Sequence, residues 1–120
     1  MPVAHVVPGL IVYRFDAPLY FPNALYFRDQ VRELVDSADP QPRWFVLNAE
    51  AVVYIDSTAV DMLRDLQREL ADRGIVFGIA RAKGMLRDVF DSTGLTRAIG
   101  SEHLFPSVRA AVRASEAGPG

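Results

Sequence analysis

The sequence predicts an α/β domain whose sheet is mostly parallel, and two observations lead to this prediction. Short apolar segments rich in β-branched and aromatic residues alternate along the chain with longer amphipathic segments. The segments at 44–48 and 75–80 consist almost wholly of apolar residues, as is typical of strands buried on both faces of a parallel sheet. We therefore expect the order β-β-α-β-α-β-α-α, with helices packed against a four-stranded sheet.

The first half of the chain begins with an expected strand at Gly9–Phe15, which is β-branched and aromatic. A second short extended piece is expected at Leu19–Phe21, where Pro22 stops it. Asn23 then stands where an N-cap belongs, because its short side chain can accept a hydrogen bond from the first turn of a helix. We expect that helix to end near Ser37.

The second half alternates strands and helices with clear punctuation. The expected elements are a strand at 44–48, a helix at Asp56–Arg73 followed by Gly74, a strand at Ile75–Ala80, a short helix at Met85–Phe90, and a last helix whose first turn holds Pro106. The whole chain, residues 1–120, is expected to form one domain with flexible ends at about 1–7 and 115–120.

The composition argues against several classes of function. The chain has 120 residues, half of them hydrophobic, which suffices for one core. It has no cysteine, which excludes disulfides, cysteine-bound zinc and a thiol nucleophile. The net charge of −2 and the lack of a basic run argue against a nucleic-acid partner. No apolar stretch is long enough to cross a bilayer, and the first residues lack the pattern of a signal peptide.

Three blocks of sequence resemble STAS domains. The block from Pro8 to Ala24 (PGLIVYRFDAPLYFPNA) resembles the opening of the STAS domains that are fused to SulP-type sulfate and anion transporters. Residues 55–59 (IDSTA) resemble the Asp-Ser motif that begins the second STAS helix. Residues 104–108 (LFPSV), followed by 110–112 (AAV), resemble the closing helix of the family. The resemblance covers roughly residues 8 to 113.

The resemblance implies a regulatory role rather than an enzymatic one. In SulP transporters the STAS domain lies on the cytoplasmic face of the membrane, so the implied partners are the transmembrane domain of the same protein and a second copy within a homodimer. In the related anti-sigma factor antagonists, the serine at the position of Ser57 is phosphorylated. Those antagonists usually carry glycine at the position of Ala59, so this chain fits the transporter group better. The free-standing antagonist remains the alternative.

A candidate ligand site follows from the predicted topology. Parallel strands at 44–48 and 75–80 would end at one edge of the sheet, where helix N-termini favour anions. We expect a weak anion or nucleotide site there, taking GTP or ATP as a regulatory ligand, with no cofactor required. Its candidate residues are Ser57, Thr58, Arg81, Lys83 and Asn48. All but Thr58 also have a structural interpretation: Asp56 or Ser57 caps a helix, Asn48 caps a strand end, and Arg81 and Lys83 are solvated charges. No phosphate-binding glycine motif is present.

The sequence offers little support for catalysis or metal binding. His5 and His103 lie far from Ser57 in the sequence, and no recognisable triad or metal-ligand spacing appears. A hydrolase built on the same sheet is therefore the least favoured interpretation. The aromatic residues near the N-terminus have two interpretations, a core with one covered sheet edge or a docking surface. They are Tyr13, Tyr20, Phe21, Tyr26 and Phe27.

Overall fold

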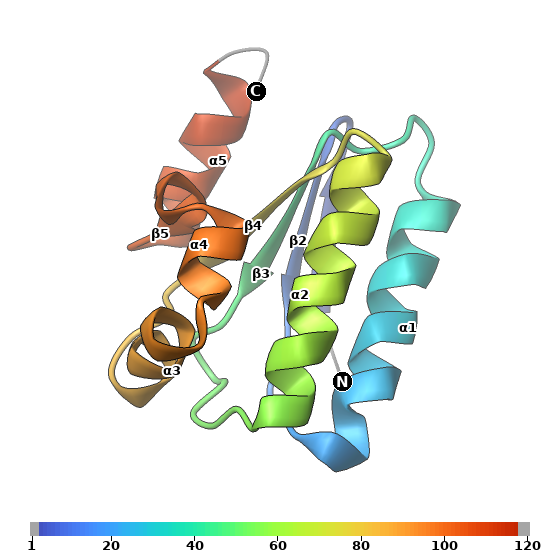
Figure 1. Cartoon of the computed structure of the whole chain (residues 1–120). Helices are drawn as coiled ribbons and strands as arrows, with labels where there is room; N and C mark the ends of the chain where they lie inside the picture. The colour runs from blue at the N-terminus through green and yellow to red at the C-terminus, as the bar shows by residue number, and fades with distance from the viewer. Residues whose placement is uncertain (1–2, 118–120) are drawn as a thin grey trace.

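The structure is a computed structural model that describes residues 3–117, with the side chains of residues 4–117. Figure 1 shows one sheet with helices on both faces. The strands, in spatial order, are β1 (Val3–Val7), β2 (Leu10–Arg14), β3 (Trp44–Asn48), β4 (Val76–Ala80) and β5 (Leu104–Phe105). The α-helices are α1 (Phe21–Ser37), α2 (Ser57–Asp72), α3 (Met85–Thr93), α4 (Leu95–Ile99) and α5 (Val108–Glu116). A 3-10 turn covers Ser101–His103.

The α/β class and the mostly parallel sheet are confirmed, but the expected number of strands was wrong. The sheet has five strands, of which only β1 runs antiparallel to its neighbour. Val3–Val7, expected to be part of a flexible end, pairs with β2 through a turn at Gly9, whose φ of +89° favours glycine. Leu19 forms only an isolated bridge with Ile55, so Leu19–Phe21 is not a strand.

The ends of several elements also differ from expectation. Asn23 is not an N-cap: α1 begins at Phe21, and the side chain of Asn23 accepts a hydrogen bond from the Tyr20 amide at 3.0 Å. The helix can begin before Pro22 because a proline in the first turn lacks only an amide that would have no helical partner. At the other end, α5 continues to Glu116, beyond the expected start of the tail. The remaining predicted ends, residues 1–2 and 118–120, lie outside the described residues.

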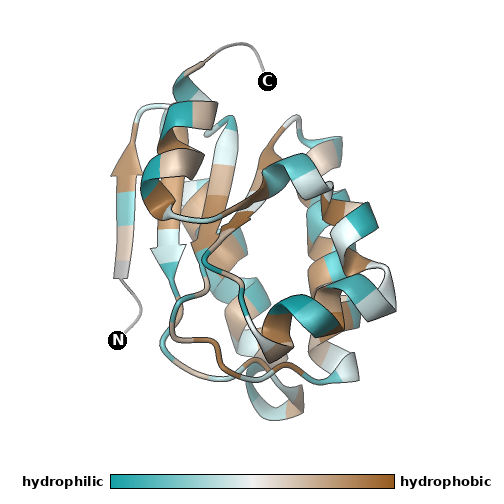
Figure 2. Ribbon diagram, turned by 90° about the vertical axis from the view of Figure 1, so that its left-hand side faces the viewer, coloured by the Kyte–Doolittle hydropathy of each residue, from teal (hydrophilic) through white to brown (hydrophobic). Residues whose placement is uncertain are grey.

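The sheet separates two cores, and the alternation of side chains along each strand explains why the strands are so apolar. In β3, Phe45 and Leu47 join the large core beneath α1, α2, α3 and α4, whereas Trp44 and Val46 join a smaller core against α5. Figure 2 shows apolar residues along the strands of the sheet and polar ones on many outer turns of the helices. Burial on both faces is what the continuous apolar runs predicted.

Gly78 explains how β5 fits beside β4 on the α5 side. A Cβ atom at this position would lie 3.0 Å from a ring carbon of Phe105 and 3.3 Å from the carbonyl oxygen of His103. These separations are tighter than most Cβ contacts in proteins, so a larger residue at this position would have to push Phe105 or β5 aside.

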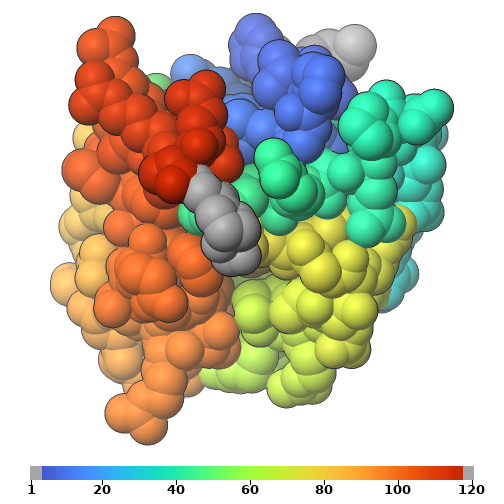
Figure 3. Space-filling view, turned by 90° about the horizontal axis from the view of Figure 1, so that it is seen from above, coloured from blue at the N-terminus to red at the C-terminus, as the bar shows by residue number. Residues whose placement is uncertain are grey.

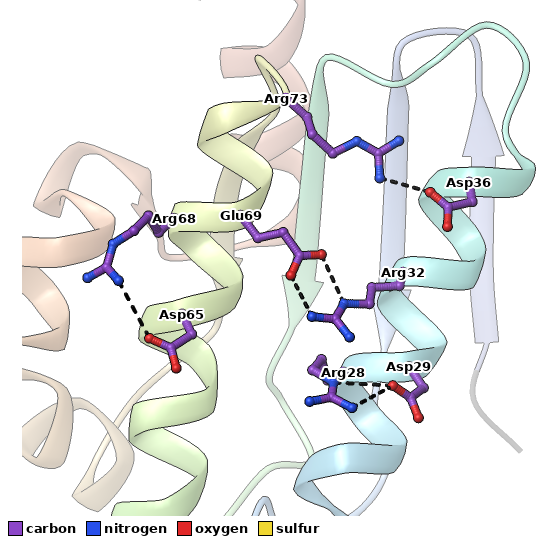
Figure 4. Close-up of polar contacts among 8 residues, drawn as sticks. All are labelled: Arg28, Asp29, Arg32, Asp36, Asp65, Arg68, Glu69 and Arg73. Carbon is purple, nitrogen blue, oxygen red and sulfur yellow. Dashed lines mark hydrogen bonds and ion pairs between the residues drawn. The ribbon is translucent and has the colours of Figure 1, made fainter.

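Ion pairs tie α1 to α2 on their outer faces, as Figure 4 shows. Arg32 donates two hydrogen bonds to Glu69, at 2.9 and 2.6 Å, and Arg73 pairs with Asp36 at 2.8 Å. The hydrogen bonds from Arg32 lower the pKa of Glu69. These pairs are partly exposed, so each contributes at most about 1 kcal/mol, and the buried faces of the two helices carry most of the stability.

The molecule has two distinct ends. The N-terminal ends of α1 and α2 and the carboxyl ends of β2, β3 and β4 lie toward the bottom of Figure 1. Figure 3 looks onto the opposite end, where the turn between β1 and β2 lies near the loops that follow α1 and α2. Along the described part of the chain, none of the helices combines the length and apolar character that a bilayer crossing requires.

Candidate functional site

The predicted site residues lie at or after the carboxyl ends of β3 and β4. Asn48 is the last residue of β3, and Arg81 comes directly after β4. The two strands run parallel, with Asn48 in register with Ala80, so their ends share one edge. The structure nevertheless divides the five predicted residues among three neighbourhoods, described in turn below.

Asp56, rather than Ser57, caps α2. Its Oδ1 accepts a hydrogen bond from the Ala59 amide at 2.9 Å, and its Oδ2 accepts one from the Phe21 amide at 2.8 Å. One carboxylate therefore serves the N-termini of both α1 and α2, where unpaired amides favour negative charge. The position that a bound phosphate would use at the start of α2 is already taken by this internal anion.

Ser57 and Thr58 face different surroundings at the start of α2. Both are exposed, but Thr58 lines the groove between α1 and α2 together with Leu25 and Arg28. Ser57 is the first residue of the helix, and its hydroxyl makes none of the hydrogen bonds found among the described residues. The prediction that these two hydroxyls join Arg81 and Lys83 in one site gains no support from the geometry.

Arg81 and Lys83 do share a pocket. This cavity of about 410 Å³ is lined by three cations, Arg81, Lys83 and Arg87, and by an apolar wall of Ala82, Leu104, Phe105 and Pro106. We call it the basic pocket. Arg87 belongs to α3 and pairs with Asp91 at 3.3 Å, whereas exposed Lys83 forms no ion pair within the described residues.

The backbone and side chain of Arg81 are both unusual. Its φ is +66°, a left-handed conformation that non-glycine residues seldom adopt. Its amide donates to the carbonyl of Phe105 at 2.9 Å, which fixes the turn against β5. Its Nη2 donates to Glu50 at 3.1 Å, while its buried Nε has no partner. An unpaired buried donor is costly and often marks a functional position.

Asn48 belongs to a third neighbourhood. Its side-chain oxygen accepts a hydrogen bond from the Glu50 amide at 3.1 Å, so it shapes the turn after β3, in agreement with the structural interpretation. Asn48 also lines a separate pocket on the α5 side with His5, Arg14 and Asp16. The hydrogen bond to Asp16 raises the pKa of Arg14.

An exposed apolar surface lies at the same end of the molecule, and sequence reasoning found only half of it. Tyr20, Phe21, Val53 and Tyr54, the apolar platform, come from two segments joined by backbone hydrogen bonds, Leu19 to Tyr54 and Asp56 to Leu19. Phe21 is 73% exposed and Val53 is 68% exposed. Of the predicted aromatic group, Tyr13 and Phe27 are buried core residues instead.

Sequence reasoning also missed Glu50 and Arg87. Arg87 could have been found, because it lies four residues after Lys83 at the start of a predicted helix. No sequence pattern marks Glu50, because its ion pairs with Arg14 and Arg81 form only where the ends of β2, β3 and β4 meet. Of the two histidines, His5 lines the pocket with Asn48 and Val108, and His103 Nδ1 lies 3.0 Å from the Ile99 carbonyl oxygen. Within residues 3–117, no three side chains are grouped as metal ligands.

The STAS domain family matches residues 1–111. The chain belongs to the STAS domain family. The Asp56–Ser57 pair thus stands at the start of the second STAS helix, where the resemblance placed it.

Two curated relatives are named as probable sulfate transporters. A probable sulfate transporter of Mycobacterium tuberculosis strain H37Rv is 49% identical over 113 residues, which cover 94% of this chain and 20% of the relative. A probable sulfate transporter of Arabidopsis thaliana is 32% identical over 121 residues, which cover 93% of this chain and 18% of the relative. The chain therefore spans about a fifth of the length of the curated relatives it matches.

Solved structures with the same fold include a SulP transporter STAS domain and anti-sigma factor antagonists. The SulP transporter STAS domain from Vibrio cholerae has a TM-score of 0.76 and 21% identity, with 94% of this chain and 85% of that chain covered. At this identity the likeness shows the fold alone. The fold is likewise shared with anti-sigma factor antagonists, so the fold does not choose between the two branches.

Proposed function

We propose that this STAS domain is the regulatory and docking domain of a SulP-type sulfate or anion transporter and works on the cytoplasmic face of the membrane without catalysing a reaction. Its partner is then the transmembrane domain of the same protein. The sulfate-transporter relatives support the transporter branch. The observation that carries the docking role is the apolar platform, because large side chains as exposed as Phe21 and Val53 tend to gather where a partner covers them.

The platform is suited to docking because its backbone is firmly held. Its two segments are joined by hydrogen bonds of 2.9 Å, from the Leu19 amide to Tyr54, and of 3.1 Å, from the Asp56 amide to Leu19. The Asp56 carboxylate adds the bond to the Phe21 amide. A surface that is already ordered loses little conformational freedom on binding.

A crosslinking experiment on the full-length protein tests the docking proposal. The domain lacks cysteine, so V53C supplies its one thiol. Any cysteines elsewhere in the full-length protein are first replaced by serine, so that a short crosslinker with one thiol-reactive and one photoreactive end starts only from position 53. We expect V53C to crosslink to the transmembrane domain. The matched control D39C, exposed in the loop before β3, should not. Equal crosslinking from both positions, or crosslinking from D39C alone, would overturn the assignment of this surface.

A regulatory anion or nucleotide is the second part of the proposal, and the basic pocket supports it. Three cations beside an apolar wall that includes Phe105 suit a phosphate group attached to an aromatic base. The site is therefore proposed at Arg81, Lys83 and Arg87, without Ser57, Thr58 or Asn48. GTP and ATP are both retained as ligands, and a dimer within the full transporter stays a prediction.

An NMR titration with GTP, ATP and sulfate tests this site. We expect chemical-shift changes centred on residues 81–87 and lost in K83Q. The control R109Q removes one positive charge at an exposed α5 residue that does not line the basic pocket, and it should leave binding intact. Flat spectra at millimolar ligand, or equal losses in K83Q and R109Q, would refute the site.

The alternative, an anti-sigma factor antagonist switched by phosphorylation at Ser57, is favoured by one observation, the exposure of this serine. Ala59 counts against it, because its amide is already bonded to Asp56, whose charge would repel a phosphate on Ser57. Incubation with an anti-sigma factor kinase and ATP, with S57A as the control, distinguishes the antagonist from the transporter domain. Stoichiometric phosphorylation that is absent in S57A would favour the antagonist.

A further inference from the structure

Glu50 lies between two arginines at the carboxyl edge of the sheet. Its Oε1 is 3.4 Å from Arg14 Nη1, and its Oε2 is 3.1 Å from Arg81 Nη2. Arg14 has a second carboxylate partner, Asp16, whereas Glu50 is the one carboxylate paired with Arg81 among the described residues. Glu50 therefore occupies the guanidinium that a ligand in the basic pocket would use.

The contact between Glu50 and Arg81 leaves part of the guanidinium unused. Glu50 takes only Nη2, and the buried Nε of Arg81 has no partner. A phosphate group commonly binds a guanidinium through two parallel hydrogen bonds. A phosphate that took the place of Glu50 at Arg81 Nη2, and also met Lys83 and Arg87, would pair with three cations, whereas Glu50 pairs with two arginines. Such a ligand can displace the internal carboxylate.

The loop that carries Glu50 also carries half of the apolar platform. Residues 49–56 join β3 to α2, with Glu50 three residues before Val53. The Ala49 amide donates to the Ala80 carbonyl at 2.8 Å, and Val52 is buried. Near its far end, the Tyr54 carbonyl accepts the Leu19 amide. Between these anchors, the ion pairs of Glu50 hold the exposed side of the loop to the ends of β2 and β4.

We propose that Glu50 is a built-in anion, that a phosphate-bearing ligand entering the basic pocket displaces it from Arg81, and that this exchange loosens the loop carrying Val53 and Tyr54. The inference rests on the proposed function, since it links the ligand pocket to the docking surface. Ligand binding would then alter docking through a single short loop, without rearrangement of the sheet.

The first test is a titration with inorganic pyrophosphate, followed by NMR, on the 120-residue chain. E50Q removes the competing charge and should bind pyrophosphate about two- to fivefold more tightly, the range that a partly exposed ion pair supports. E33Q is the matched control, because Glu33 is an exposed α1 residue without an ion pair in the described part of the chain. It makes the same change in net charge and should bind as the wild-type chain does.

The second test measures the link to the platform. Amide hydrogen exchange at Leu19 reports the bond to Tyr54, and we expect saturating pyrophosphate to speed it at least threefold. E50Q without ligand should show the same faster exchange.

The possible outcomes separate the two proposals. Equal affinities of E50Q and E33Q would overturn the competition while leaving the pocket intact. Binding without a change at Leu19 would overturn the link to the platform. No binding by either the wild-type chain or E50Q would remove both the pocket and the inference.

Discussion

Replacing Tyr13 by phenylalanine should stabilise the protein, because this change removes one buried hydroxyl that has no partner. Tyr13 is 1% exposed, and its ring packs against Phe15, Phe27 and Phe45 at centroid distances of 6.3, 5.7 and 6.1 Å. An unsatisfied buried polar group costs about 1–3 kcal/mol, and losing one oxygen leaves a small cavity that offsets part of the gain. We expect Y13F to raise the free energy of unfolding at pH 7 by about 1 kcal/mol.

The same hydroxyl should make stability depend on alkaline pH. Burial, and secondarily the charge of Tyr26, raises the pKa of Tyr13 from its ordinary value of 10.0 to about 12. The folded-state pKa thus exceeds the unfolded-state pKa, so this contribution to stability is complete below pH 10 and is lost as the pH rises through 12. This rise in the pKa of Tyr13 corresponds to about 2.7 kcal/mol of stability that the wild-type chain loses at alkaline pH. Y13F has no hydroxyl at this position and should not lose it.

Urea unfolding of the wild-type chain, Y13F and the control Y54F at pH 7 and pH 11.5 would check both parts. Tyr54 is 44% exposed, so Y54F should follow the wild-type chain at each pH. The difference in the free energy of unfolding between Y13F and the wild-type chain should grow by about 2 kcal/mol from pH 7 to pH 11.5. A Y13F variant that is less stable at pH 7, or whose advantage does not change with pH, would show that the hydroxyl has a partner.

Two further substitutions test the ends of the helices and the close contact beside β5. D56A should cost about 2 kcal/mol and S107A about 1 kcal/mol in thermal unfolding, because Asp56 serves two helix N-termini and Ser107 serves one; equal costs would mean that the bond to Phe21 contributes nothing. G78A should lower the free energy of unfolding by about 1–3 kcal/mol in urea, because the added methyl group meets Phe105 at 3.0 Å. Its backbone needs no positive φ, so unchanged stability would show that β5 moves freely aside.

Most of the fold could be predicted because burial leaves a periodic pattern in the sequence. The helices at 21–37 and 57–72 and the strands at 44–48 and 76–80 all match amphipathic or continuously apolar segments. The strand at Val3–Val7 was missed, because edge strands have fewer buried positions and therefore a weaker pattern. Likewise, β5 has two residues, too few for any pattern to appear.

The candidate site was harder to predict, because contacts across loops leave no periodic pattern. Topology correctly placed Arg81 and Lys83 at the carboxyl edge and Asp56 at the start of a helix. The prediction that they form one site with Ser57 stays untested, and in the structure Arg81 pairs with Glu50 and lines a pocket with Lys83 and Arg87 that Ser57 does not line. Such grouping depends on side-chain directions after the strands end, which local sequence does not determine.

The position of Trp44 gives the protein a natural optical probe of one core alone. Trp44 is the single tryptophan and lies on the α5 side, with its ring 5.5 Å from that of His103 and 6.0 Å from that of Phe105. Its fluorescence therefore reports the packing of α5 and β5, whereas far-ultraviolet circular dichroism reports all helices together. Coincident unfolding curves from the two signals would mean that the sheet transmits unfolding between its faces. An earlier change in fluorescence would mean that α5 detaches while the four helices on the other face stay folded.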